Sequence, residues 1–231
     1  MNFTRCHLAP VLVASVLLLA TFAQAQTHSY PTMAPIADYQ MSRDAEIMMA
    51  RTAAPDSISR DAEILVLGSK GYEVAAKGTN GFVCMVQRSF AAGVEDPVFW
   101  NPKLRAPICL NPEAAHSYLR HLTKKAEWAL AGLTKEQITT RIKDALAGKE
   151  FPAYEPGAMG YMMSKELYLS DSDPHWHSHL MFFVAATKAA TWGANLPGSP
   201  VLADTDAPEQ TTIFMVPVAK WSDGTPAPTM E

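Results

Sequence analysis

Short apolar runs alternate with turn-forming residues in the first half of the chain. The segments 63–67, 72–76 and 82–88 are rich in β-branched and apolar residues, and glycine-bearing connectors separate them. This spacing predicts three strands joined as a β-meander. The connector at 77–81 predicts a tight hairpin turn, and a phosphate-binding loop there would need a helix where a strand is expected.

A proline-rich stretch follows at residues 91–112. It carries four regularly spaced prolines, with Phe99 and Trp100 between them. Since proline removes a backbone donor, neither a helix nor a central strand is expected to persist there. The stretch is therefore predicted to be a long ordered loop, either a binding loop or a structural loop anchored in the core.

Helical patterns frame this loop. Ser42 can cap a short helix before it, and Asn111 followed by Pro112 predicts the start of a longer one after it. An apolar stripe with helical spacing continues to a predicted end at Gly132. Thr134 opens a capping-box pattern, so a second helix is expected next, and the short connection predicts an antiparallel helical hairpin.

Strand patterns return in the last third of the chain, at 159–163, 177–184 and 211–219. Leu180–Val184 is apolar on both faces, which indicates a central strand. The residues 193–208 are expected to form a loop. The whole pattern predicts an α+β fold, with an antiparallel or mixed sheet of about six strands and the helical hairpin packed on one face.

The N-terminus has the pattern of an export signal. Val11–Leu19 is a short apolar core, and Ala23-Gln-Ala25 is a small-residue cleavage sequence. Cleavage is expected after Ala25, which predicts a periplasmic or extracellular protein. The expected organisation is a signal peptide at 1–25, a flexible leader at 26–40, a single α+β domain at 41–221 and a loose tail at 222–231.

The charge of the chain argues against two classes of binding partner. The formal net charge is −4, and no block of like charge occurs. That composition argues against nucleic acid and anionic membrane surfaces as partners. No segment after the signal is long and apolar enough for membrane insertion.

Two cysteines, Cys84 and Cys109, remain after cleavage. An even pair in an exported chain is normally oxidised, so a disulfide bond between them is expected. A reactive thiol, with Cys84 as the nucleophile, is the functional alternative.

One polar stretch, Asp171-Ser-Asp-Pro-His-Trp-His-Ser-His179, combines several possible metal ligands. In an extended chain Asp173, His175, His177 and His179 share one face, and adjacent imidazoles lie about 7 Å apart. A His-x-His pair could therefore hold Zn²⁺ or Cu²⁺ with a further ligand from elsewhere, and the alternative is a set of locally hydrogen-bonded histidines.

The candidates for that further ligand include a carboxylate and two histidines, His116 and His121, which are expected to be surface residues of one helix. Two functions remain open on these grounds. The first is an exported binding domain for a ligand or metal, without turnover. The alternative is a metal-dependent, hydrolase-like enzyme that uses the His175, His177 and His179 cluster. Nucleophile-elbow, dinucleotide-binding, Walker-type and Cys-x-x-Cys motifs are absent.

Four segments carry a resemblance that covers most of the mature chain. They are Gly78-Thr-Asn-Gly-Phe-Val-Cys84, Trp100-Asn-Pro-Lys103, His175-Trp-His-Ser-His-Leu-Met-Phe-Phe183 and Lys220-Trp-Ser-Asp-Gly224. The chain resembles a group of uncharacterised exported bacterial proteins in these segments. The resemblance implies no activity, ligand or catalytic residue.

Overall fold

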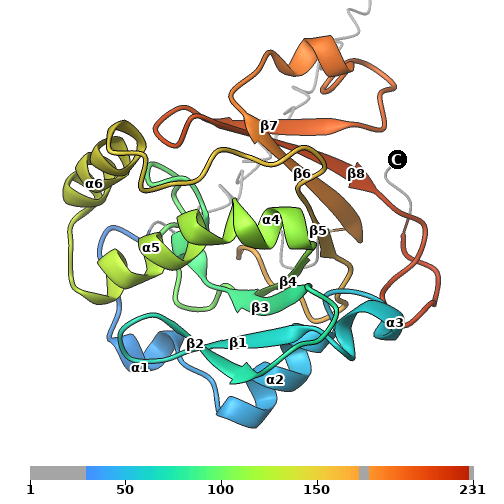
Figure 1. The fold of residues 1–231 in the computed structure, drawn as a ribbon, viewed down its shortest axis with the longest axis horizontal. Helices are drawn as coiled ribbons and strands as arrows, with labels where there is room; N and C mark the ends of the chain where they lie inside the picture. Colours follow the sequence, from blue (N-terminus) through green and yellow to red (C-terminus); the bar gives the residue numbers. More distant parts are fainter. Residues whose placement is uncertain (1–29, 172–176, 229–231) are drawn as a thin grey trace, which may run out of the picture.

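The computed structural model describes residues 30–171 and 177–228. These residues form an α+β fold around one mostly antiparallel, open sheet of eight strands (Figure 1). The strand order is β2-β1-β3-β4-β5-β6-β8-β7. The strands are β1 (Glu63–Leu67), β2 (Tyr72–Ala76), β3 (Val83–Gln87), β4 (Ala106–Leu110), β5 (Met159–Met162), β6 (His179–Ala185), β7 (Leu202–Asp206) and β8 (Thr211–Pro217).

The helices are short and lie mainly in the first two thirds of the chain. The α-helices are α1 (Ile36–Tyr39), α2 (Arg43–Arg51), α3 (Asp56–Ser59), α4 (Pro112–His116), α5 (Leu119–Leu130) and α6 (Lys135–Ala147). Two 3₁₀ turns are η1 (Ser89–Ala91) and η2 (Ala189–Trp192). None of the helices in this described part combines the length and the hydropathy needed to cross a bilayer.

Helices cover both faces of the central strands. On one face Ala50 of α2 packs with Ile64 and the two cysteines, whereas on the other Tyr118 and Leu122 pack over the alternate residues of the same strands. Figure 1 shows α4 and α5 crossing the middle of the sheet and α2 beside β1. Alternating strand residues point to opposite faces, so both sets can be apolar and buried at once.

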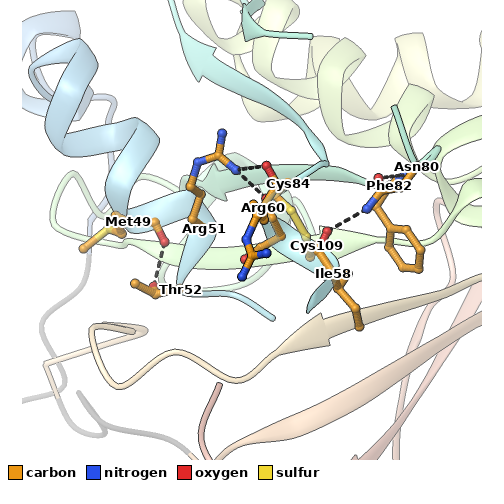
Figure 2. The surroundings of a disulfide bond; sticks show 10 residues. Met49, Arg51, Thr52, Ile58, Arg60, Asn80, Phe82, Cys84 and Cys109 are labelled. Carbon is orange, nitrogen blue, oxygen red and sulfur yellow. Dashed lines mark hydrogen bonds between the residues drawn. A yellow bond between two sulfur atoms is a disulfide. The ribbon is translucent and has the colours of Figure 1, made fainter. Parts of the chain in front are cut away.

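The disulfide bond between Cys84 and Cys109 is present, as the sequence predicted. The two residues are directly opposite each other on β3 and β4, with Cα atoms 4.0 Å apart. Figure 2 shows the bridge beside α2, where Arg51 donates to the carbonyl oxygens of Ser59 and Arg60. Both cysteines are fully buried, so the pair cross-links the core instead of providing a nucleophile.

The predicted β-meander is wrong in its pairing. β2 pairs antiparallel with β1, but β3 returns to the other edge of β1 and pairs with it in parallel. β1 therefore lies between the other two strands. Hydrophobic pattern identifies strands but does not say which edge a later strand joins, because both edges of β1 offer the same backbone groups.

The proline-rich stretch contains a central strand, contrary to expectation. All five residues of β4 are buried, and Pro107 pairs in register with Val86. Asn111 donates to the carbonyl oxygen of Met159, so by alternation the N–H that Pro107 lacks would face the β5 side of the strand. The ladder between β4 and β5 pairs only Cys109 and Leu110, so Pro107 lies beyond its paired residues and the proline removes no hydrogen bond from it.

The helical hairpin is only partly as predicted. Asn111 accepts from the backbone of Ala114, and Thr134 forms the full capping box with Gln137. However, the first predicted helix is divided into α4 and α5 at residues 117–118. Of the predicted hairpin, α4 and α5 lie on the sheet, whereas α6 packs against α5. β7 was also missed, inside the segment expected to be a loop.

The segment expected to be a leader contains α1, whose Tyr39 is fully buried and donates to the carbonyl oxygen of Trp100. A buried ion pair nearby joins Glu46 of α2 to Arg88, with 2.9 Å between Oε2 and Nη2. Glu46 also accepts from the backbone N–H of Leu67. These contacts fix α1 and α2 to the sheet.

Candidate functional site

The predicted histidine cluster lies partly outside the described residues, which exclude Asp173 and His175. His177 is half-buried, and His179 begins β6 with its ring almost fully buried. Nδ1 of His179 is 2.7 Å from the carbonyl oxygen of His177. Burial is the main cause that lowers the pKa of His179 to about 4. Within residues 30–171 and 177–228, no group of three or more His, Cys, Asp or Glu side chains is arranged to hold a metal ion.

A different polar cluster is buried under α5. It joins His121 and Lys125 of α5 to Glu209, which lies in the turn between β7 and β8. The side chains of His121, Lys125 and Glu209 are 1%, 1% and 4% exposed. His121 was predicted to lie on the surface, and this prediction is wrong, because His121 belongs to the buried face of α5.

Lys125 is fully satisfied in this cluster. Its Nζ forms an ion pair with Oε1 of Glu209 and donates to the carbonyl oxygens of Ala91 and Ala92, at 3.0 and 3.1 Å. These contacts use all three donors of the ammonium group. A buried charge is tolerated only when it is paired and hydrogen-bonded in this way.

Glu209 is held in place from both sides. Its backbone N–H donates to Oδ1 of Asp206, at 2.9 Å, and its carbonyl oxygen accepts from the hydroxyl of Thr211. Burial alone would raise the pKa of the Glu209 carboxyl, but the charge of Lys125 and the contact with His121 outweigh it and hold that pKa below its ordinary value. Glu209 is therefore an ionised carboxylate inside the protein.

The His121 imidazole is sandwiched among aromatic rings. Its centroid is 4.0 Å from that of Phe151, 5.3 Å from that of Tyr154 and 6.1 Å from that of Tyr118, and all three pairs are stacked. Nδ1 lies 3.6 Å from Oε2 of Glu209 and 3.5 Å from the Tyr154 hydroxyl. Nε2 is buried and has no hydrogen-bond partner among the residues described.

A cleft of about 780 Å³ opens beside His121. Its walls come from α5, the segment between α6 and β5, the end of β6, η2 and the β7–β8 turn. Most of the lining is apolar, and the aromatic and polar side chains include His121, Phe151, Tyr154, Phe182, Trp192 and Glu209. Trp192 is stacked on Phe214 at 4.2 Å, which places its half-exposed ring at the wall.

A second cavity of about 360 Å³ also has Glu209 in its lining, with residues of η1 and of strands β6 to β8. Its lining combines Met162, Met181 and Met215 with the carboxylates of Asp204 and Asp206. Burial, followed by the charge of Glu209, raises the pKa of Asp206. Glu209 is therefore part of the lining of both the apolar cleft and this cavity.

Sequence reasoning missed Lys125, Tyr154 and Glu209. The positions of His121 and Lys125 were visible in the sequence, since both fall on the apolar stripe that includes Leu122 and Ala126. A histidine and a lysine on the buried face of a helix need partners, which is a usable signal. The sequence does not say that the partner comes from a turn near residue 209.

No protein-family model, curated protein or solved structure matches this chain. The site therefore has to be interpreted from its own geometry.

Proposed function

We propose that this chain is an exported binding domain whose small-molecule ligand occupies the cleft beside His121. The observation that carries the proposal is the cleft itself, which is largely apolar, has aromatic walls and includes the side chain of His121 in its lining.

The size and lining of the cleft support the same function. Small-molecule sites are typically concave, about 300–1,000 Å³ in volume, mostly apolar and marked by a few fixed polar groups. This cleft has about 780 Å³, several aromatic walls and one imidazole held by stacking and by Glu209. A planar apolar molecule fits these walls, since aromatic side chains favour stacked or edge-on contacts.

Export is supported by two observations. The apolar core at Val11–Leu19 and the cleavage sequence at Ala23-Gln-Ala25 have the form of a secretory signal. The buried Cys84–Cys109 bond is of a kind that persists in oxidising compartments. The ligand would then be a molecule that this domain meets outside the cytoplasm.

Calorimetric titration with 2-methoxynaphthalene and 2-naphthol tests the proposal. Both probes should bind the wild-type protein. Ala185→Trp should abolish the heat of binding, because Ala185 is an exposed residue that lines the cleft. Ala186→Trp is the matched control: Ala186 is also exposed but is not part of the lining. If neither probe binds, or if both variants bind as well as the wild type, the cleft is not the ligand site.

The metal-dependent enzyme remains the alternative from the sequence, and it depends on Asp173 and His175. The described residues offer it no third ligand for His177 and His179. No observation in the described part favours it over binding without turnover.

A further inference from the structure

We propose that the second cavity, of about 360 Å³, is a binding site for a soft monovalent cation, Cu⁺. The ligands are the thioether sulfur atoms of Met162, Met181 and Met215, which line this cavity. The site is distinct from the cleft beside His121, so it does not depend on the binding function proposed for that cleft.

The three methionines lie on one face of the sheet, on three neighbouring strands. Met181 of β6 and Met215 of β8 are directly opposite each other in register. Met162 of β5 is opposite His179, and Met181 follows His179 by two residues, so it lies on the same face. Directly opposite residues have Cβ atoms about 4.5–5.5 Å apart, and diagonal neighbours about 7–8 Å, which long side chains still span. The three thioether groups can therefore converge on one ion.

The methionine side chains border open space. Met162 is buried, whereas Met181 and Met215 keep part of their surface exposed. Methionine often fills irregular gaps in a core, but these three line a cavity instead. Because the side chain has three rotatable bonds, a sulfur atom can turn toward an ion in this space without movement of the strands. Residues 91–93, 96 and 98 of the proline-rich stretch are also part of the lining, which agrees with the binding loop that was one of its two predicted roles.

Thioether sulfur is a soft and uncharged ligand, and this chemistry selects the metal. Soft sulfur ligands favour Cu⁺, whereas Zn²⁺ sites in proteins are built mainly from thiolates, imidazoles and carboxylates. In the part of the chain that the structure describes, no group of three or more His, Cys, Asp or Glu side chains is arranged for such a harder ion. The methionine set therefore favours Cu⁺ over Zn²⁺.

Carboxylates near the methionines supply the negative charge that thioethers lack. Asp204 and Asp206 of β7 are part of the same lining, and the register of β7 with β8 places them on the face that carries the methionines. Arg88, the one Lys or Arg side chain among the described lining residues, is already paired with Glu46. A cation that enters the cavity is therefore attracted, whereas an anion is repelled.

Methyl NMR of the untagged protein with ¹³C-labelled methionine tests the site, with Ag⁺ as a redox-stable probe in place of Cu⁺. In chloride-free buffer, one equivalent of Ag⁺ should shift the methyl signals of the three cavity methionines. Those of Met41 and Met49 should stay in place, because both residues pack against the core on the opposite face of the sheet. An excess of Zn²⁺ should not displace the probe.

Met181→Leu/Met215→Leu removes two sulfur atoms and keeps the apolar volume, an exchange that cores usually tolerate. In anaerobic competition with a chromophoric Cu⁺ chelator, this variant should bind Cu⁺ about tenfold more weakly or worse, since even groups behind metal ligands typically contribute about 10–100-fold. Met41→Leu/Met49→Leu is the matched control, because both residues are also partly buried, and it should bind as the wild type does. His177→Ala should keep the wild-type affinity, which separates this site from the predicted histidine cluster.

Three results would overturn the proposal. The first is that Ag⁺ does not bind, or binds without moving the methyl signals of Met181 and Met215. The second is equal Cu⁺ affinity of the wild type and of Met181→Leu/Met215→Leu. The third is loss of Cu⁺ binding in His177→Ala, which would assign the ion to the histidine cluster. If the methionine variant does not fold, the methyl spectra of the wild type still decide.

Discussion

Nδ1 of His121 lies 3.6 Å from Oε2 of Glu209, although the first residue belongs to α5 and the second to the turn between β7 and β8. Lys125 holds the other oxygen of the same carboxylate. The C-terminal hairpin is thus attached to α5 through buried charges, and this attachment forms one wall of the cleft.

Removing Lys125 should destabilise the protein strongly. Lys125→Met leaves the Glu209 carboxylate buried without its cation, and loss of one partner of a buried pair typically costs about 3–5 kcal/mol. Lys125→Met/Glu209→Gln should recover much of this loss because no uncompensated charge remains. The matched control is Lys165→Met, whose partner Asp223 is about half exposed, and which should change the free energy of unfolding little. Chemical denaturation of the four proteins gives the comparison.

Acid should weaken the wild type partly through Glu209. Its pKa is lowered in the folded state, so its contribution to stability is present above its ordinary value of 4.5 and is lost as the pH falls below it. Asp206 acts in the opposite direction, because its raised pKa makes the folded state bind the proton more readily. Between pH 5 and pH 3 the Lys125→Met/Glu209→Gln variant should therefore lose less stability than the wild type, and Asp206→Asn should lose more. Equal slopes in denaturation measured across this range would contradict the pairing.

The disulfide bond should contribute to stability but not to ligand binding. It closes a separation of 25 residues, for which the loop-entropy estimate is about 3–4 kcal/mol. Cys84→Ala/Cys109→Ala should unfold at lower denaturant concentration and still bind 2-naphthol in buffer, since the bridge is not part of the cleft lining. Mass analysis of unfolded wild type without reductant should find no free thiol at either cysteine.

The histidine cluster gives a separate prediction. If His177 belongs to a metal site with a histidine on either side, untagged protein should bind Zn²⁺ or Cu²⁺, and His177→Ala should bind them more weakly. Elemental analysis and metal titration decide the question. If the protein carries no metal and His177→Ala binds added ions as well as the wild type, the histidine cluster has a structural role only.

Local patterns predicted the elements better than their arrangement. The strands near residues 63–67 and 72–76 and both helix caps, at Asn111 and Thr134, were visible because alternation and capping act over a few residues. β4 was missed because the proline rule assumes a lost ladder bond, whereas Pro107 lies beyond the residues that pair β4 with β5, Cys109 and Leu110. The parallel pairing of β3 with β1 depends on long-range packing that no local pattern encodes.

Local patterns likewise placed only some residues of the candidate site. His121 and Lys125 could be placed on the buried face of a helix from their spacing with Leu122 and Ala126. Glu209 could not, because it lies in a connection between two strands, one of which, β7, is only half-buried and has a polar sequence. The cleft exists only where α5, the β7–β8 turn and the segment after α6 meet, and that meeting is a property of the complete fold.

The most direct test of the account is an NMR titration of the ¹⁵N-labelled histidine rings with 2-naphthol. The ring signals of His121 should shift as the probe saturates the cleft, because His121 is part of the lining, while those of His177, which is not, stay in place. The shift at His121 should be absent in Ala185→Trp and present in Ala186→Trp. A His121 signal that does not respond to the probe, or that responds equally in both variants, would contradict a ligand site at this imidazole.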